Sequence, residues 1–468
     1  MNRRDLLPGA LAAAVLVATP SNRAAAQTCV APCYERTPRE ISENIVPEDY
    51  QYPPGNVLRY GADPTGKVSA TSAINTAILA TPAGGGIVDF PVGYYRCEGP
   101  ILCDQRLAIT LRGRGGVTAA QESTKLNFTP ASNGASFISM HAAQGCTIED
   151  LQIHASDTFT GYLIDFSRRP DESEAVLNEV RRCLIGNPYT SNTLCYGINL
   201  DKATNFTARG NKFEYLKAAI HGQSGAGHSY SNCVRILENV FIGIEDHAIA
   251  YGGEAWQIRG NTFEQRKSGV AGAFGCLEGT PCHGLSFEDN WFGDVETDGG
   301  QWVIVFGGGF VFKGNRCGGS AGSHAISLHA VDGADISGNS FDTFAVVVSF
   351  DGATCRNISV GENEYASVTN VYGSPNNQSS FRRSPVGFAS LPNGLLMQWG
   401  QLPISGGANI AVTFPRSFGA VYSVVASLVG PTAPTNVAYA NNVTTTGMTA
   451  GMSGSGAGTL HWIATGNQ

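Results

Sequence analysis

After residue 27 the sequence contains no apolar run that approaches the roughly 18 or more residues of a membrane-spanning helix. Positive charge is also scarce, because 30 Lys and Arg stand against 38 Asp and Glu in 468 residues, for a formal net charge of −8. A basic surface for nucleic acid is therefore not expected. These two deficits predict a soluble protein with no membrane span and no nucleic-acid partner.

Metal-binding motifs are absent as well. The twelve cysteines form no Cys-x-x-Cys pair, and no histidine stands at ligand spacing, so we expect neither a metal nor a cofactor. Metal binding is the competing interpretation, but an even number of cysteines in an exported chain favours disulfides. Three pairs are near enough in sequence to close small loops: Cys29 with Cys33, Cys97 with Cys103, and Cys276 with Cys282.

The first 27 residues have the composition of an export signal. Arg3 and Arg4 precede an apolar stretch that reaches Ala18, and three alanines stand before Gln27. The paired arginines resemble the twin-arginine type of signal. We therefore expect a periplasmic, secreted or cell-surface protein after the signal is removed.

Segments with a helical period are rare, and a short repeat fills residues 206–365 instead. Each unit has apolar residues five and three positions before an Asn and usually an aromatic residue two positions after it. This alternation predicts a strand with one buried face. A unit this short must stack on its neighbours to bury that face, which predicts a solenoid. The Asn positions are Asn211, Asn239, Asn261, Asn290, Asn315, Asn339 and Asn363.

Two solenoid classes fit this repeat, the leucine-rich repeat and the parallel β-helix. A leucine-rich repeat needs Leu at most apolar positions and a helix on its outer side. Here the positions hold Phe, Ile, Val and Ala, and a second β-like segment follows the aromatic residue. The predicted fold class is therefore all-β, a right-handed parallel β-helix solenoid followed by a small all-β C-terminal domain. The stacked Asn and Phe residues are expected to be architectural.

Composition divides the chain further. Residues 101–200 hold less regular turns, with loops expected over 154–178 and 186–195. A stretch rich in Ser, Asn and Pro follows the last repeat and indicates a linker. The expected segments are 1–27, export signal; 28–55, irregular leader; 56–372, parallel β-helix; 373–393, linker; and 394–468, all-β module.

A second signature lies between residues 57 and 95. A strand is expected to end in Tyr60-Gly61-Ala62-Asp63, helical spacing covers Ser72 to Leu79, and Gly84-Gly85-Gly86 leads into Pro91-Val92-Gly93-Tyr94-Tyr95. This pattern resembles the pectate lyase superfamily, in the branch of rhamnogalacturonan-degrading enzymes and phage tailspike depolymerases. The resemblance implies a β-helix whose open end is capped by a short helix. Members differ in substrate and reaction, so it does not fix the chemistry.

The C-terminal module carries motifs of its own. Gln398-Trp399-Gly400, Phe414-Pro415, Tyr422-Ser423-Val424-Val425 and Trp462-Ile463-Ala464-Thr465-Gly466 resemble the small C-terminal domain of some phage tail fibres. In such fibres the module lies at the tip, usually in a trimer, and contacts the host surface. The resemblance implies a homotrimer, with Trp399 and Trp462 expected mainly as core residues.

Charged residues gather in the segment that follows the aromatic position of successive repeats. Neighbouring turns lie about 4.8 Å apart, so carboxylates one or two turns apart suit sugar hydrolysis, at roughly 5 to 10 Å. In β-elimination a base removes a proton next to a uronate carboxylate that cations neutralise. The alternative interpretation is that these charged residues only form a solvated face of the turns and take part in no reaction. The candidate catalytic residues are Glu245, Asp246, His247, Glu264, Arg266, Asp294 and Glu296, and the candidate substrate-binding residues are Lys267, His324 and Trp302.

The resemblance leaves the reaction open. Polygalacturonase-like relatives carry Asn-Thr-Asp, Asp-Asp, Gly-His-Gly and Arg-Ile-Lys motifs, and none of these occurs here. The leading hypothesis is an exported carbohydrate-active protein that cleaves an acidic or branched polysaccharide by hydrolysis or β-elimination. A non-catalytic glycan-binding adhesin or tail-fibre-like protein is the alternative, and a purely structural surface protein is the third.

Overall fold

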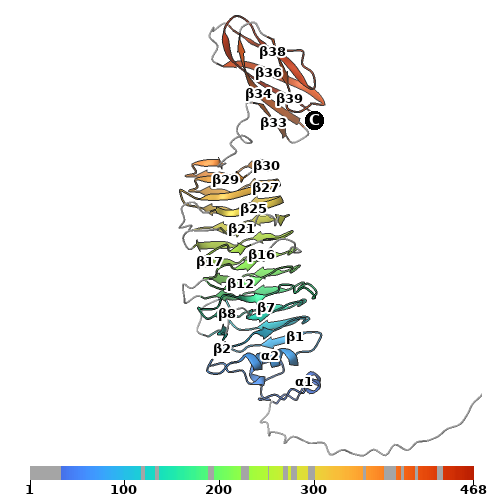
Figure 1. Cartoon of the computed structure of the whole chain (residues 1–468), viewed down its shortest axis with the longest axis vertical. Coiled ribbons are helices and arrows are strands. Elements are labelled where there is room, and N and C mark those ends of the chain that lie inside the picture. Colours follow the sequence, from blue (N-terminus) through green and yellow to red (C-terminus); the bar gives the residue numbers. More distant parts are fainter. Residues whose placement is uncertain are drawn as a thin grey trace, which may run out of the picture.

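The computed structural model describes residues 33–117, 122–131, 136–187, 194–222, 231–250, 252–266, 272–275, 282–293, 301–351, 355–373, 386–391, 395–405, 409–429 and 436–467. The predicted export signal, residues 1–27, lies outside these ranges. No helix among the described residues is long and apolar enough to cross a membrane. Figure 1 shows a stack of strands with helices at its N-terminal end and a separate β domain beyond its last turn.

The N-terminal end of the stack is covered by α1 (Pro38–Ser42), η1 (Val57–Tyr60) and α2 (Thr71–Ala80). The helix expected over Ser72 to Leu79 is therefore confirmed. The strand expected at Val57 is wrong, because Asn56 caps a 3₁₀ turn there by accepting from the backbone N–H of Leu58. The segment expected to be an irregular leader contains α1, which is tied to η1 by a fully buried ion pair between Glu40 and Arg59.

Three strand ladders then build the parallel β-helix, as predicted (Figure 1). The first ladder contains β1 (Gly86–Asp89), β4 (Ile109–Arg112), β7 (Thr147–Glu149), β10 (Glu179–Arg181), β13 (Thr207–Arg209), β16 (Arg235–Leu237), β19 (Gln257–Arg259), β23 (Ser286–Glu288), the later parts of β25 (Gln301–Lys313) and β27 (His324–Ser337), and β30 (Arg356–Gly361). The short β22 (Cys282–His283) also pairs with β25.

The second ladder contains β2 (Gly93–Cys97), β5 (Thr124–Phe128), β8 (Gln152–Ala155), β11 (Leu184–Gly186), β14 (Lys212–Glu214), β17 (Val240–Ile244), β20 (Thr262–Arg266), β24 (Trp291–Phe292), β26 (Arg316–Gly318), β28 (Ser340–Asp342) and β31 (Glu364–Ala366). The third contains β3 (Ile101–Leu102), β6 (Ile138–Ser139), β9 (Tyr162–Asp165), β12 (Tyr196–Asn199), β15 (Ile220–His221), β18 (Ile249–Ala250), β21 (Phe274–Gly275), the first parts of β25 and β27, β29 (Val346–Asp351) and β32 (Asn370–Gly373). β9 lies inside a segment expected to be a loop.

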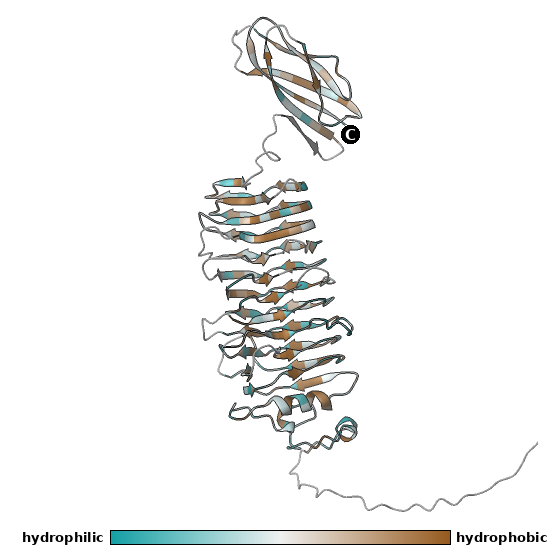
Figure 2. Ribbon diagram, in the orientation of Figure 1, coloured by the Kyte–Doolittle hydropathy of each residue, from teal (hydrophilic) through white to brown (hydrophobic). Residues whose placement is uncertain are grey.

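The core explains why this repeat folds as it does. Hydrophobic residues recur in the strands throughout the stack (Figure 2). Phe213, Phe241, Phe263 and Phe292 stack with ring centroids 4.8 to 5.0 Å apart. Each Asn from Asn211 to Asn339 bonds to the turns on either side in an Asn ladder, and Asn363 bonds to the preceding turn. Cys183 takes the equivalent position one turn before Asn211, and its backbone N–H donates to Asn211 Oδ1. These contacts are the reason for assigning an architectural role to the stacked Asn and Phe side chains.

The C-terminal domain has two antiparallel sheets. One contains β33 (Val386–Leu391), β34 (Leu395–Ser405), β39 (Ala457–Asn467) and β36 (Ala420–Val429), and the other contains β35 (Asn409–Thr413), β38 (Gly447–Met452) and β37 (Ala438–Asn441). β33 falls within the expected linker but pairs with β34 along its whole length. Trp462 is buried between the sheets as expected, whereas Trp399 is only half-buried.

The cysteines differ from the expectation. Eight of those in the described residues are free thiols, including Cys97 and Cys103, so the small loop expected between these two is wrong. Six of the eight are buried, and Cys233 is exposed. Cys29 and Cys276 lie outside the described residues, so the other two small loops stay predictions.

Candidate functional site

One strand position of the third ladder forms a continuous row whose side chains point away from the core, although most of its members are buried. The position just before it holds Ile138, Ile164, Ile198, Ile220 and Ile249, which are all fully buried in the core. Successive side chains of a strand point to opposite faces, so the next residue points outward. This row, called here the outward column, is Leu102, Ser139, Asp165, Asn199, His221, Ala250, Gly275, Ile304, Ser327 and Ser349.

The polar members of the column are held by hydrogen bonds near its N-terminal end. Asp165 accepts from the Ser136 hydroxyl at 2.7 Å and from the Ser167 backbone N–H at 3.0 Å. Ser139 donates to Asp104 at 2.6 Å. These residues are rigidly placed before any ligand arrives, as a binding surface requires.

An aromatic cluster occupies the next turns. The rings of Tyr162 and Tyr196 lie 5.1 Å apart, and the His221 ring is 5.6 Å from Tyr162 and 6.0 Å from Tyr196. The exposed Lys217 places its ammonium 5.4 Å from the centre of the Tyr196 ring. The pKa of Lys217 is raised, chiefly by the side chain of Tyr196 and less by Asp246 and Glu245. Lys217 therefore stays protonated and positively charged. Aromatic faces beside a cation suit an anionic sugar.

Asp246 and His247 lie beside this cluster. His247 Nδ1 is 2.9 Å from Asp246 Oδ1, and this hydrogen bond lowers the pKa of Asp246. Burial lowers the pKa of His221 to about 4, although the charges of Asp246 and Asp165 act in the opposite direction. At neutral pH the site therefore combines a neutral imidazole, an ionised carboxylate and an ammonium group. A neutral imidazole can accept a proton, and both carboxylates would favour the imidazolium that forms.

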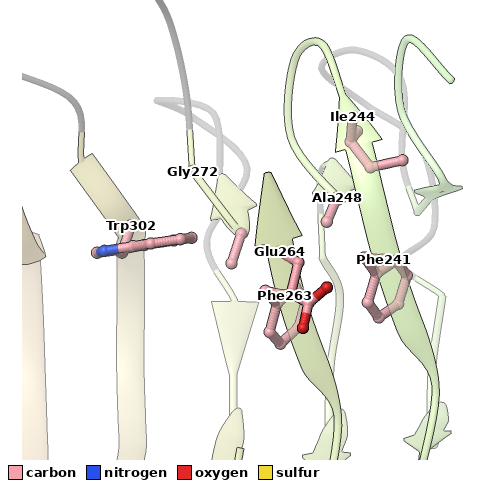
Figure 3. Close-up of a pocket in the computed structure, with 8 residues that line it drawn as sticks. Phe241, Ile244, Ala248, Phe263, Glu264, Gly272 and Trp302 are labelled. Atoms are coloured by element: carbon pink, nitrogen blue, oxygen red, sulfur yellow. The ribbon is translucent and has the colours of Figure 1, made fainter. Parts of the chain in front are cut away.

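Glu264 lines a small, almost entirely apolar pocket between the second and third ladders. The other lining residues are Phe241, Ile244, Ala248, Phe263, Gly272, Ala273 and Trp302. Trp302 lies across this pocket from Phe241 and Ile244 (Figure 3). It is 2% exposed and packs edge-on against Phe292, with ring centroids 5.5 Å apart. Trp302 is thus a core residue in this structure, not an outer surface for sugar stacking.

The structure brings together only part of the set expected from the sequence. Asp246 and His247 join the aromatic cluster, whereas Glu245 is exposed at its edge. His324 lies four turns beyond His221 on the third ladder and is partly buried, which lowers its pKa. Arg266 ends β20, and its side chain is not described. Lys267, Asp294 and Glu296 lie outside the described residues, so their roles stay predictions.

Sequence reasoning missed Asp165, Tyr196 and His221. Asp165 belongs to β9, which was expected to be a loop. His221 belongs to no complete motif, because His221-Gly222 follows Ile220 and matches only part of Gly-His-Gly. A shared signal was nevertheless present, because Tyr162-Leu163-Ile164-Asp165 and Tyr196-Gly197-Ile198-Asn199 have the same pattern and pair in register.

Comparisons with known proteins agree with this architecture. Residues 55–274 match the family model described as rhamnogalacturonase A/epimerase, pectate lyase-like. Residues 390–467 match the model described as putative tail fiber protein gp53-like, C-terminal. No curated protein sequence matches the chain.

Several solved structures are similar to parts of the chain. The surface adhesin PfbA of Streptococcus pneumoniae is 15% identical with a TM-score of 0.50, over 73% of this chain and 98% of PfbA. The Dettilon tailspike protein gp208 is 10% identical with a TM-score of 0.43, over 87% of this chain and 94% of the tailspike. The family 28 exopolygalacturonase of Yersinia enterocolitica is 11% identical with a TM-score of 0.37, over 68% of this chain and 77% of the enzyme. The chain thus joins a parallel β-helix, matched over residues 55–274 by a pectate lyase-like family model, to a C-terminal domain that matches a tail-fibre model.

Proposed function

We propose that the protein is an exported, surface-acting carbohydrate-active protein that binds an acidic polysaccharide along the outward column and cleaves it at the aromatic cluster. The observation that carries this proposal is the grouping of Tyr162, Tyr196, Lys217 and His221 on adjacent turns, with Lys217 exposed, both tyrosines half-buried and His221 6% exposed. The rings provide faces for sugar stacking, and Lys217 neutralises a uronate carboxylate. The match to a rhamnogalacturonase/epimerase model supports a polysaccharide as the ligand.

Of the two cleavage reactions, this grouping favours β-elimination. Elimination needs a proton acceptor, a cation at the carboxylate and a proton donor for the leaving oxygen. The proton acceptor is the neutral imidazole of His221, and the cation is the ammonium group of Lys217. The proton donor is the phenol of Tyr196, whose ring lies next to His221. Hydrolysis instead needs a protonated carboxyl group, and Asp246 is unsuited to that role because His247 favours its ionised form.

The test combines turnover with binding. The mature protein is incubated with bacterial capsules and plant pectins, and both new reducing ends and the absorbance of unsaturated uronates are followed. β-Elimination gives both signals, whereas hydrolysis gives reducing ends alone. Binding without either signal would refute cleavage and identify a glycan-binding adhesin or tail-fibre-like protein.

Two variants locate the site. Lys217→Gln removes the cation and should weaken binding of an acidic glycan, while His221→Gln should lower turnover about 100-fold or more, the usual contribution of a general base. The matched control is Lys313→Gln, because Lys313 is an exposed lysine on the first ladder, paired with Asp335. Equal losses in Lys217→Gln and Lys313→Gln would show that overall charge, not this cluster, governs binding.

A further inference from the structure

A serine and a histidine meet farther along the same outward column, apart from the aromatic cluster. Ser327 Oγ lies 3.1 Å from His329 Nε2 on β27. The two residues are two positions apart on one strand, so both side chains project from the same face. This distance is within the range expected for a nucleophile and its general base.

Neighbouring groups hold both members of this pair. Ser349, the register partner of Ser327 on the next turn, has its hydroxyl 3.0 Å from Ser327 Oγ and 3.3 Å from the Ile326 carbonyl oxygen. The His329 ring is stacked on Phe306 with centroids 4.5 Å apart, which holds the imidazole in place. Acyl transfer needs a serine nucleophile and a general base that are held in position before the substrate binds.

The position in the fold points to the substrate. Ser327 is four turns from His221 on the same column, or about 19 Å at 4.8 Å per turn. A polysaccharide bound along this column would bring its hydroxyl substituents past Ser327. Ser327 itself is only 2% exposed, so the acyl group that reaches it must be small.

We propose that Ser327 and His329 form an esterase site that removes short acyl groups, such as O-acetyl, from the polysaccharide. The choice of a polysaccharide ester rests on the proposed function, whereas the dyad itself does not. Ser327 Oγ attacks the acyl carbon while His329 Nε2 takes its proton, and His329 returns that proton to the sugar oxygen as the ester C–O bond breaks. Water then hydrolyses the acyl-serine, giving a carboxylic acid and restoring the hydroxyl.

The first experiment needs no glycan. The full-length protein is treated with a fluorophosphonate, the modified serine is identified by mass spectrometry, and hydrolysis of p-nitrophenyl acetate is measured in parallel. Ser327 should be labelled, and Ser327→Ala and His329→Gln should each lose at least about 100-fold of the hydrolysis rate. Ser337→Ala is the matched control, because Ser337 lies on the same strand, β27, but in the first ladder, where its hydroxyl donates to Asp335. It should keep most of the rate.

The outcomes separate this proposal from the proposed function. No label on Ser327, or an undiminished rate in a folded Ser327→Ala variant, would overturn the dyad whatever happens to the glycan. Esterase activity on the small ester without any glycan binding would keep the dyad and refute the polysaccharide as substrate.

Discussion

Replacing Asn261 with alanine should destabilise the middle of the solenoid while leaving any activity per folded molecule unchanged. The Asn261 side chain is 1% exposed and takes part in four hydrogen bonds. Its Oδ1 accepts from the backbone N–H and the Nδ2 of Asn239, at 2.9 and 3.0 Å. Its Nδ2 donates to the Ile236 carbonyl at 2.8 Å and to Asn290 Oδ1 at 3.0 Å.

The magnitude follows from what the alanine leaves behind. Asn239 Nδ2 keeps its bond to the Ala208 carbonyl, and Asn290 Oδ1 still accepts from the backbone N–H of residue 261. The Asn239 N–H and the Ile236 carbonyl lose the partner that the side chain supplied. At about 1–3 kcal/mol for each buried group left unsatisfied, the variant should lose about 2–6 kcal/mol.

Amide hydrogen exchange read by mass spectrometry suits this prediction, because a solenoid opens locally and a single unfolding free energy need not apply. Peptides from β16, β19 and β20 should exchange faster in Asn261→Ala. Asn363→Ala is the comparison, since Asn363 ends the Asn ladder, is half-buried and makes three side-chain hydrogen bonds. Equal protection of these peptides in Asn261→Ala and parent would refute the Asn ladder as a source of stability.

Three further predictions concern pH, thiols and assembly. Burial lowers the pKa of His154 to about 4 from an ordinary value of 6.5, so the unfolded chain binds more protons between these values. Stability should therefore fall as pH drops from about 6.5 to 4, by up to about 1.4 kcal/mol per pH unit, and His154→Gln should flatten this slope in urea titrations. Thiol titration should find at least eight free thiols in the unfolded, non-reduced protein, with Cys233 reacting fastest in the native one; a total below eight would contradict the structure. The tail-fibre-like domain exposes Tyr422, Val425 and Ile463 on one sheet. Light scattering should therefore show a homotrimer for the intact protein and a monomer after residues 386–468 are deleted. A monomer for the intact protein would reject this assembly.

The repeat could be predicted because its determinants are local. The Asn, the apolar pair before it and the aromatic residue after it lie within eight residues, across the corner between the first and second ladders. That corner has nearly the same number of residues in each turn. One sequence pattern therefore places the Asn and the aromatic residue, such as Asn261 and Phe263, at equivalent positions in successive turns. The sequence did not predict β9 and β33, because each is a short strand inside a longer segment rich in polar residues. Their partners, not their own composition, make them strands.

The site was only partly predictable because the connection between the second and third ladders changes length. Phe213 precedes His221 by eight residues, whereas Phe263 precedes its column equivalent, Gly275, by twelve. Counting forward from the aromatic position therefore reaches the outward column in one turn and a loop in another. Asp246 and His247 were found because they end such a connection, and His221 was missed because it lies on the column itself.

The same geometry separates stability from function within a single turn. Asn211 and Lys217 are six residues apart, but Asn211 is buried at the corner of the first two ladders and Lys217 is exposed beside the third. Asn211 bonds to the Cys183 N–H, the Val180 carbonyl and Asn239, so Asn211→Ala should lower exchange protection by about 2–6 kcal/mol, as for Asn261→Ala. Lys217→Gln touches no buried group, so it should change stability by less than about 0.5 kcal/mol while weakening binding of an acidic glycan. Measured on one glycan and by one exchange protocol, the two variants should give opposite results. Parallel losses of binding and protection in both would show that the aromatic cluster depends on the Asn ladder for its shape, and the division between scaffold and site would fail.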